Sequence, residues 1–558
     1  MSFREAQASS EKLTVGLIVD SGLVSKYLYQ LAEWGQGQES LQITHLIIQK
    51  SIYSNQSRFK KLVHEFKTRG LIHLIRVISF RAITFVESMV ANRSVKYKDH
   101  LKKADLGDCI KSMVEIYPII SKSGYVYRFS DDDILQVKGL KLDVLVHCGS
   151  GVLRGGILQS ARFGVITANP SDVRYFRGGP PGFWEVFYKK DCTGFTIQQL
   201  TEEMGKENIL FRGQFSTRFF YVLNQAFLYI RADYFLKQML SSIATNKALP
   251  PFISSMPYFN SYFELPTIRQ QARYTLSVIH RVFNKFLEKI NKDKRHLWQV
   301  AFAKTNWNSL VMMDGIAIPN PPGHFLADPF VIDVDKRSYC FVEDFDEVTD
   351  KGSITVYELH EDHAERIGEA ISEPFHMSFP YVFEYQSKIY MVPETFVINE
   401  VRLYECVSFP LEWKLKQVLM SDVSAADTML LQRDGLWWLF TNIDPLNSAD
   451  HCLQLSIFYS ESLFSSEWHP HTQNPIFIDS SIARNAGVLV DDNSMYRVSQ
   501  HQGFDQYGKG ALVNRISILN KAEYLETFVM SIEPHFFKDL KGTHHIHSDG
   551  RYTVFDFI

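Results

Sequence analysis

Hydrophobic residues in the first third of the chain come in short, unbroken runs separated by polar turns and helical patterns. The runs at residues 13–19, 43–48 and 142–147 are rich in β-branched side chains. After the first run, apolar residues recur at helical spacing over residues 27–32. Short buried runs that alternate with helices are typical of parallel strands covered on both faces. The pattern predicts an α/β domain with a doubly wound parallel sheet.

A different pattern starts after residue 296, where short β-rich segments follow one another with turns between them. A polar or acidic phrase precedes a strand at residues 327–330, 378–381, 426–429, 483–487 and 542–545. The phrases recur roughly every 50 to 60 residues, which is the length of a four-stranded propeller blade. The second half is therefore predicted to be all-β and to form a five-bladed β-propeller.

These two patterns, and the basic, helix-forming stretch between them, divide the chain into three parts. A chain of 558 residues is longer than one hydrophobic core normally serves. We expect an α/β domain over residues 1–240, a helical connector over residues 241–295 and a five-bladed β-propeller-like domain over residues 296–558.

Composition and charge exclude several classes of protein. With 45% hydrophobic and 22% charged residues, the chain has the composition of a globular protein. The formal net charge of -3 gives no general attraction to nucleic acid, so no nucleic-acid partner is expected. The six cysteines include no Cys-x-x-Cys pair, so neither a disulfide framework nor a thiolate zinc site is predicted. The N-terminus lacks the apolar core of a signal peptide, and we expect a cytoplasmic protein.

The most membrane-like stretch lies at residues 71–90 and is interrupted by Arg76, Arg81 and Glu87. It falls short of the about 20 consecutive apolar residues that a transmembrane helix needs. No transmembrane segment is therefore expected. We predict an amphipathic helix packed against the protein core, with a helix at a membrane surface as the alternative.

The most informative segment of the first half is Gly-Val-Ile-Thr-Ala-Asn-Pro-Ser at residues 164–171. An Arg-Gly-Gly-Pro-Pro turn follows at 177–181, and Gly-Phe-Thr-Ile at 194–197. A strand that ends in such a loop usually contributes to a site. The segment resembles the core of the formyltransferase superfamily, in which an Asn-x-His-Pro-Ser stretch precedes an Arg-Gly turn. The resemblance implies transfer of a formyl group from formyl-tetrahydrofolate to an amine.

The family's catalytic Asn, His and Asp are all replaced in this chain. In register, Thr167 stands at the Asn position, Asn169 at the His position, and Gly205 near the Asp position. An amide at residue 169 can donate a hydrogen bond to an oxyanion but cannot take a proton. Three interpretations stay open: a transferase that uses substitute residues, a binding domain without chemistry, and a different reaction.

The loops around this segment supply the substitute residues. Asn169 is the candidate oxyanion donor, and the nearby carboxylates that can serve in catalysis are Asp172, Glu202 and Glu203. For Asp172, capping of the loop is the alternative role. The candidate substrate-binding residues are Thr167, Ser171, Arg174 and Arg177. Both arginines suit a phosphate or carboxylate, although Arg177 beside a glycine can equally brace the turn.

The second half closely resembles the propeller-like domain of glucosamine inositolphosphorylceramide transferases. The phrases that carry the resemblance lie at residues 325–330, 379–384, 393–395, 435–440 and 542–544. Bacterial proteins with this domain resemble fusions with a formyltransferase-like first half, in which Arg-Gly-Gly-Pro-Pro-Gly-Phe-Trp-Glu-Val recurs, as at residues 177–186 here. The chain is thus similar to a bacterial fusion of the two. The resemblance implies a nucleotide- or lipid-linked sugar as partner and an activated amino sugar as acceptor.

The strand-entry phrases of a propeller converge on its axis, which gives a second candidate site. We expect Asp328, Glu394, Asp427, Arg484 and His544 to line one funnel. Three roles are weighed for them: capping of turns, binding of a sugar or phosphate, and hydrolysis of a glycoside by paired carboxylates. No metal is expected, because no carboxylate or cysteine completes a ligand set with the histidines at residues 544–547.

The function predicted from these observations is formyl or acyl transfer to an activated amino sugar in glycan or envelope biosynthesis. Where the fold keeps its familiar reaction, formyl-tetrahydrofolate is the donor. Two alternatives belong to other classes. One is a carbohydrate-binding or scaffold protein without turnover, and the other is a propeller that itself transfers or cleaves a sugar.

Overall fold

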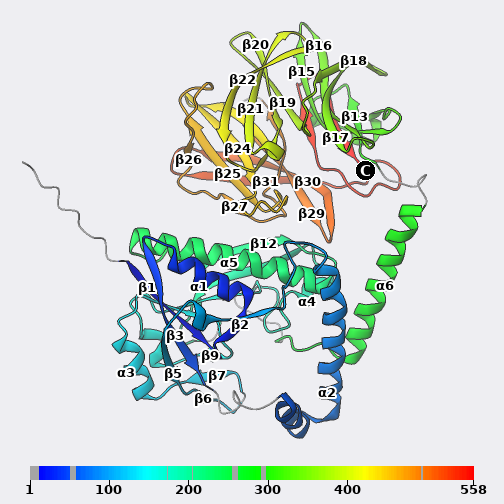
Figure 1. Cartoon of the computed structure of the whole chain (residues 1–558). Helices are drawn as coiled ribbons and strands as arrows, with labels where there is room; N and C mark the ends of the chain where they lie inside the picture. Colours follow the sequence, from blue (N-terminus) through cyan, green and yellow to red (C-terminus); the bar gives the residue numbers. More distant parts are fainter. Residues whose placement is uncertain are drawn as a thin grey trace, which may run out of the picture. The chain divides into compact units, whose positions relative to one another are not determined.

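The computed structural model describes residues 12–50, 58–122, 124–172, 174–203, 205–253, 262–290, 297–491 and 494–558. The chain divides into two units (Figure 1). The first contains residues 1–213 and 218–284, and the second contains residues 214–217 and 285–558. Residues 241–284 of the predicted connector group with the first unit and residues 285–295 with the second. The three-part division with boundaries at 240 and 295 stays a prediction.

The first unit is built around a seven-stranded sheet with the strand order β12-β11-β10-β8-β1-β3-β5. Five of these strands run parallel: β1 (Leu13–Val19), β3 (Leu41–Gln49), β5 (Ser112–Ile116), β8 (Val144–His147) and β10 (Val165–Asn169). Then β11 (Cys192–Gln199) pairs antiparallel with β10, and β12 (Asn208–Ser216) forms the edge. The predicted α/β class of the first part is confirmed, and the strands at 13–19, 43–48 and 142–147 lie where the hydrophobic runs place them.

Helices cover both faces of this sheet. Helices α1 (Lys26–Gln36) and α5 (Tyr221–Asn246) pack on each other and on β3, and α5 also contacts β10 and β11. On the other face, Val137 of α3 (Asp131–Gly139) joins a buried cluster with Ile18, Ile47 and Leu145. Burial on both faces explains why these strands are almost continuously apolar.

The remaining elements of this part include two long helices, α2 (Arg58–Ala91) and α6 (Ile268–Ile290), and the short helix α4 (Phe183–Phe187). The short strands are β2 (Leu23–Ser25), β4 (Lys103–Asp105), β6 (Ile119–Ile120), β7 (Val126–Arg128) and β9 (Val152–Leu153). Within the described ranges, no helix has the length and apolar character needed to cross a bilayer.

The helix predicted over residues 71–90 is present as the second part of α2, after a kink at Gly70. Its packing differs from the prediction. Phe80, Glu87 and Ala91 are buried against the unit, but many of its large apolar side chains are exposed to solvent. The sequence analysis expected the apolar side of this helix to pack against the protein core, whereas the structure exposes much of that side to solvent.

The described part of the second unit contains five antiparallel sheets, and it confirms the predicted all-β character. Four of them use consecutive strands. The strands are β15 (His324–Val334), β16 (Arg337–Asp346), β17 (Lys351–Leu359), β18 (Ala364–Ile371); β19 (Ser378–Tyr385), β20 (Lys388–Glu394), β21 (Glu400–Ser408), β22 (Glu412–Ser421); β23 (Ala425–Arg433), β24 (Leu436–Ile443), β25 (Gln454–Ser460), β26 (His469–Pro470), β27 (Phe477–Ile478); and β28 (Asn485–Asp491), β29 (Ser494–Gly503), β30 (Gln506–Leu519), β31 (Tyr524–Ile532).

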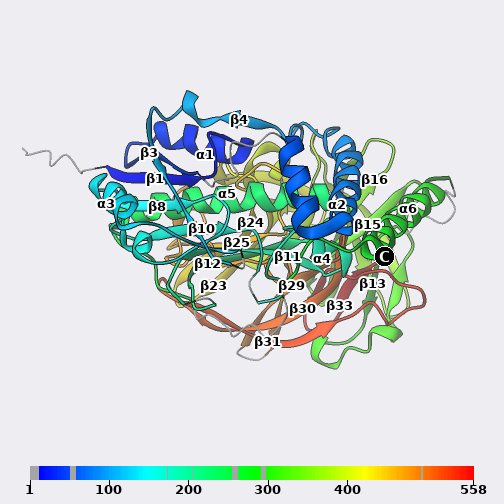
Figure 2. The same ribbon diagram turned by 90° about the horizontal axis from the view of Figure 1, so that it is seen from below.

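The fifth sheet joins the two ends of the second unit. It has the order β14-β13-β33-β32, with β13 (Gln299–Ala303) and β14 (Ile316–Ile318) from the start of the unit. Its partners β32 (Ile546–Ser548) and β33 (Thr553–Phe557) come from the end of the chain. Figure 2 shows β13 beside β33, and Ala301 stands opposite Phe555 in the register. This pairing of early and late strands removes two sheet edges that would otherwise be open.

Candidate functional site

A cavity of about 1110 Å³ lies in the first unit, at the carboxyl ends of the parallel strands β8 and β10. Loops after these strands line it, including Gly149, Gly151 and Pro170. Apolar side chains from α1 and α5, such as Leu31 and Leu236, form part of its wall. Open α/β sheets bind their ligands at this end of the strands, so the cavity occupies the expected position for a site.

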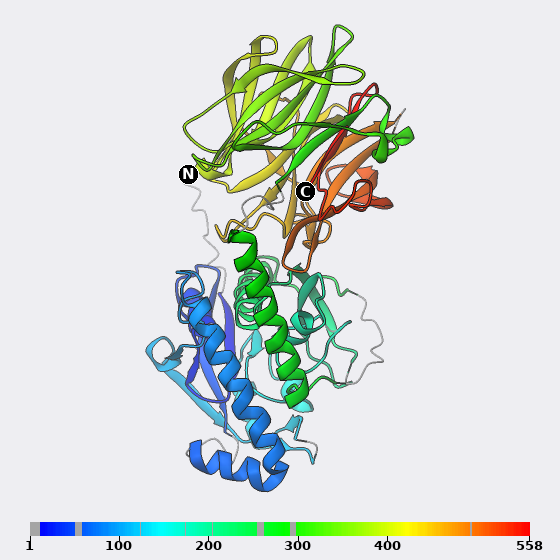
Figure 3. The same ribbon diagram turned by 90° about the vertical axis from the view of Figure 1, so that its right-hand side faces the viewer.

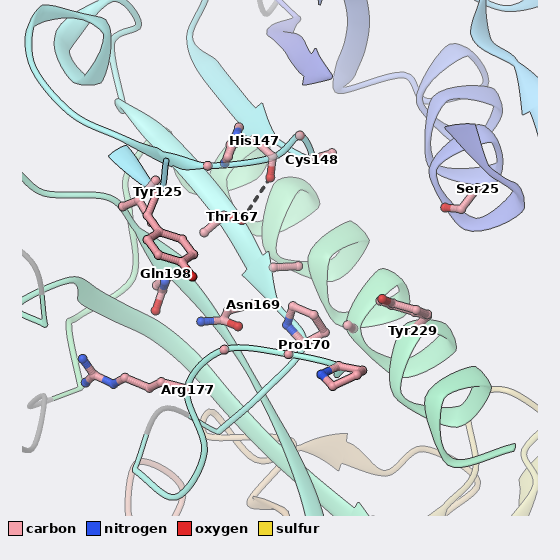
Figure 4. A pocket seen from close by; sticks show the side chains of 18 of the residues that line it. Ser25, Tyr125, His147, Cys148, Thr167, Asn169, Pro170, Arg177, Gln198 and Tyr229 are labelled. Atoms are coloured by element: carbon pink, nitrogen blue, oxygen red, sulfur yellow. Dashed lines mark hydrogen bonds between the residues drawn. The ribbon is translucent and has the colours of Figure 1, made fainter. Parts of the chain in front are cut away.

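Strand β10 carries two of the predicted site residues into the cavity. Thr167 and Asn169 both line it, and Thr167 donates a hydrogen bond to the backbone oxygen of His147 at 3.0 Å. Gln198 of β11 stands opposite Thr167 in the antiparallel register and lines the same cavity. The oxygen of the Asn169 amide accepts a hydrogen bond from Ser171 at 3.0 Å, so its NH₂ group is the part that is oriented to donate. Figure 4 shows Asn169, Gln198 and Arg177 gathered on one side of the cavity.

The Arg-Gly-Gly-Pro-Pro turn forms another wall of the cavity. Gly178 has a positive φ of 97°, and a Cβ at this position would lie 2.1 Å from the backbone oxygen of Phe263. The amide of Phe263 in turn donates to the backbone oxygen of Arg177 at 2.8 Å. Only glycine fits this close approach of two backbones. The turn therefore fixes residues 262–265, which also line the cavity.

The carboxylates predicted for catalysis lie outside the described lining of the cavity. Asp172 is buried and pairs with Arg174, whose terminal nitrogen lies 2.6 Å from its carboxylate, and it accepts from the backbone of the same residue. Glu202 is half exposed and pairs with Arg128 at 2.9 Å. Glu203 is exposed and pairs with Lys206 at 2.6 Å. These contacts brace loops, so the catalytic roles of the three carboxylates stay predictions without support from their positions.

Glu207 and His147 are among the titratable residues of the cavity lining that the sequence analysis missed. Glu207 lies two residues beyond Gly205, accepts from the Gly205 amide at 3.2 Å and pairs with the buried Arg154 at 3.3 Å. A carboxylate is thus present next to the position where the family pattern has lost its Asp. His147 ends β8, and burial lowers its pKa to about 4. Its buried Nε2 atom has no hydrogen-bond partner among the described residues.

In the second unit, the repeated phrases form the same distortion in four sheets. In β15, β19, β23 and β28, the register with the next strand shifts at the phrase, which is the mark of a β-bulge. Asp328, Phe379 and Asp427 occupy the left-handed region there, with φ of 50°, 46° and 48°. Bulges re-aim side chains, and non-glycine residues with positive φ are held in place by their surroundings. The sequence repeat is therefore a repeat of backbone geometry.

All the predicted residues of the second unit enter buried ion pairs. Arg484 lies between two carboxylates, with nitrogens 3.2 Å from the Asp427 carboxylate and 3.6 Å from that of Glu394. His544 lies between two others, with Nε2 3.0 Å from Asp328 and Nδ1 3.0 Å from Asp556. The five predicted side chains are 15% exposed or less. The structure brings them together, but their roles stay predictions.

A further carboxylate in this cluster was missed by the sequence analysis. Glu343 of β16 is buried, and burial raises its pKa well above the ordinary value, with the charges of Asp328 and Glu394 adding to the effect. The pKa of Asp427 is also raised well above its ordinary value, by burial first of all, so Glu343 and Asp427 are both acids of the cluster whose charge burial disfavours. Two aromatic rings flank the cluster at His544: the centroid of Trp298 lies 4.1 Å from the imidazole and that of Tyr507 lies 5.2 Å away.

Asp328, His544 and Asp556 could in principle hold a metal ion, because one ligand atom of each lies within 4.8 Å of the others. Burial alone would lower the pKa of His544, but the carboxylates of Asp556 and Asp328 raise it to about 10. A protonated imidazole donates from both nitrogens and cannot ligate a metal. The ion pairs account for this arrangement without a metal, and the expectation that no metal is bound stays a prediction.

Comparisons with known proteins separate the two parts of the chain. Residues 285–552 match the family model for glucosamine inositolphosphorylceramide transferase 1, N-terminal. The chain is 38% identical over 213 residues to glucosamine inositolphosphorylceramide transferase 1 of Arabidopsis thaliana, covering 37% of this chain and 28% of the relative. The rice (Oryza sativa subsp. japonica) protein of the same name is 39% identical over 210 residues, with the same coverage. The chain thus spans only 28% of the length of these curated relatives.

The other part of the chain is similar to formyltransferases. Methionyl-tRNA formyltransferase of Deinococcus radiodurans is 30% identical over 92 residues, covering 16% of this chain and 29% of the relative. A sugar N-formyltransferase from Shewanella sp has 12% sequence identity and a TM-score of 0.27, covering 47% of this chain and 86% of that chain. Together, the sequence matches fit a fusion of a formyltransferase-like region with the N-terminal domain of glucosamine inositolphosphorylceramide transferases.

The ion pairs of His544 predict a pH-dependent contribution to stability. Because its pKa is raised from 6.5 in the unfolded chain to about 10, the contribution is fully present below pH 6.5 and is lost as the pH rises through 10. His544→Gln should lower the free energy of unfolding at pH 7 by about 3–5 kcal/mol, because two buried carboxylates lose their cation. Chemical denaturation of the full chain between pH 6 and 10 measures both effects.

The matched control is His469→Gln, which changes an exposed histidine of the same unit. It should leave the unfolding curve unchanged. A His544→Gln variant that is as stable as the parent at pH 7 would show that the ion pairs contribute nothing.

Proposed function

We propose that this chain is a sugar-modifying transferase, and that the cavity of the first unit transfers a formyl or acyl group to an activated amino sugar. The observation that carries the proposal is the convergence of Thr167, Asn169, Gln198 and Arg177 on one cavity at the strand ends. The formyltransferase match of the first part supports transfer of a formyl group, and the glucosamine transferase match of the second part supports a sugar substrate. A cytoplasmic enzyme that acts on a nucleotide- or lipid-linked sugar is the corresponding proposal for location and partner.

Each side chain of the cavity has a role that its chemistry allows. The NH₂ group of Asn169 stabilises the oxyanion that develops on the transferred acyl group. Arg177 binds the phosphate of the activated sugar through its guanidinium. His147 is neutral at pH 7 because its pKa is about 4, and its Nε2 can accept a hydrogen bond from the attacking amine. Glu207 pairs with Arg154 and takes the place of the missing Asp at 205.

The cavity fits a reduced folate as the formyl donor. Ligand pockets commonly measure about 300 to 1,000 Å³, so a cavity of about 1110 Å³ has room for a folate together with a sugar. Leu28, Leu31 and Leu236 give an apolar wall of the kind that binds a flat ring system. When bound, formyl-tetrahydrofolate would supply the formyl group. The residues of the chain would orient it and exclude water.

Isothermal titration of the full chain with the stable analogue 10-formyl-5,8-dideazafolate, whose formyl oxygen Asn169 can contact, tests the proposal. We expect binding, and we expect Asn169→Ala to weaken it about three- to tenfold, which corresponds to the loss of one hydrogen bond. Glu203→Ala is the matched control, because Glu203 is exposed and lies outside the lining of the cavity. A folded chain that gives no heat of binding, or an Asn169→Ala variant that binds as the parent does, would contradict the proposal.

A second function is favoured by the acid cluster of the second unit. We propose that its five sheets form a five-bladed propeller and that the cluster binds or cleaves a glycoside at the axis. The raised pKa of Glu343 suits a general acid, while Asp328 and Asp427 are the candidate partners, since glycoside cleavage uses paired carboxyl groups. Trp298 and Tyr507 provide faces on which a sugar ring can stack. A cluster that only binds carbohydrate would make this unit a scaffold for the transferase.

Glu343→Gln separates these possibilities, because glutamine mimics the protonated carboxyl but cannot give up a proton. If the cluster is catalytic, release of nitrophenol from p-nitrophenyl glucosaminide should fall at least 100-fold. Glu365→Gln, at an exposed position of the same sheet, is the control and should keep full activity. If the parent chain releases no nitrophenol, the cleavage proposal for this substrate is wrong.

A further inference from the structure

Helix α2 presents a continuous apolar stripe to solvent. Its large members Leu71, Ile75, Ile78, Phe85 and Met89 are between 43% and 63% exposed. Together with the exposed Ala82, they follow one another at intervals of four and three residues, which places them on one side of the helix. Phe80, Glu87 and Ala91 lie on the opposite side and are buried. A stripe of this length is unusual on the surface of a soluble protein and marks a binding surface.

Helix α6 adds a second apolar stripe beside the first. Within the first unit, its exposed members are Ile268, Leu276, Ile279, Val282 and Phe283. Hydrogen bonds connect the two helices: Ser79 to Gln271 at 2.6 Å, and Gln271 to the backbone oxygen of Arg76 at 3.0 Å. Figure 3 shows α2 in blue and α6 in green running side by side. The two stripes therefore belong to one surface, which we name the α2/α6 surface.

The charges around this surface have one sign. Residues 71–98 contain five arginines and lysines, Arg76, Arg81, Arg93, Lys96 and Lys98, and their single acidic residue, Glu87, is buried. Residues 268–284 contain Arg269, Arg273 and Arg281 and no acidic residue. The net charge of the whole chain is -3, so this local excess of positive charge is a property of the two helices and of the turns that follow α2. An apolar face with a basic rim is the arrangement of helices that lie in the interface of an anionic bilayer.

We propose that the α2/α6 surface docks the first unit on the surface of an anionic lipid bilayer. The apolar stripes enter the boundary between headgroups and acyl chains, while the arginines and lysines contact lipid phosphates. A second copy of the chain fits the surface less well, because two such faces packed together would bring two basic rims into contact. The proposal is independent of the transfer reaction and concerns where the chain is held.

Docking in this manner would place the cavity near the lipid headgroups. His73 and Arg76 of α2 and the residues just before α6, Phe263 and Leu265, line the cavity of the first unit. The same helices thus form the proposed membrane contact and a wall of the candidate site. A sugar linked to a lipid could reach the cavity without leaving the bilayer.

Flotation of the full chain with vesicles tests the proposal. One set of vesicles contains phosphatidylcholine alone, and the other contains phosphatidylcholine with phosphatidylglycerol. We expect binding to the anionic vesicles that weakens as salt is raised. The variant Phe85→Glu/Met89→Glu should lose at least tenfold in binding, and Arg93→Glu should lose on the order of fivefold, the effect of one basic residue at an anionic surface.

The control variant is Val348→Glu/Val397→Glu, which changes two exposed apolar residues of the second unit and should bind as the parent does. Circular dichroism shows whether each variant is folded. Three results would overturn the proposal: no binding of the parent chain to anionic vesicles, equal binding by the folded Phe85→Glu/Met89→Glu variant, or a dimer in light scattering that this variant abolishes while vesicle binding is absent.

Discussion

The candidate site of the first unit depends on the change of strand direction at β10. This strand pairs in parallel with β8 on one side and antiparallel with β11 on the other. The antiparallel register sets Gln198 opposite Thr167, while the parallel neighbour sets the end of β8 beside the end of β10. Polar groups from three strands therefore meet at one point. The loops that follow, above all the Gly178 turn that approaches Phe263, complete the walls of the cavity.

In the second unit, buried carboxylates and the cations between them hold the acid cluster together. The bulges at Asp328 and Asp427 direct carboxylates into an interior where an isolated charge would be costly. Arg484 and His544 each lie between two carboxylates, and burial raises the pKa of Glu343 because it disfavours the charged form. Such a network holds its members in fixed positions only while all of them are present. This property suits a binding site, and it also makes the cluster a structural element.

Much of this architecture could be predicted from the sequence. The buried runs placed β1, β3 and β8, and the repeated phrases led to Asp328, Glu394, Asp427, Arg484 and His544, which the structure places in ion pairs of one unit. Local patterns carry this information because strands and bulges are formed by neighbouring residues.

Other features required the tertiary structure. Glu207 and Glu343 lack a motif, and only the packing brings them to the cavity and to the acid cluster. Asp172 has the right chemistry for catalysis, but its pairing with Arg174 keeps it in the loop. The exposed apolar stripe of α2 has the same residue spacing as a stripe that packs against the core. Spacing alone therefore cannot predict whether the stripe faces solvent or the core.

The central claim is that the cavity of the first unit holds an activated amino sugar. A crystal structure of the full chain with UDP-glucosamine tests it most directly. We expect density for the sugar nucleotide in this cavity, with a phosphate at Arg177 and the amino sugar near Asn169. Density for the sugar at the acid cluster of the second unit, with none in the cavity, would contradict it.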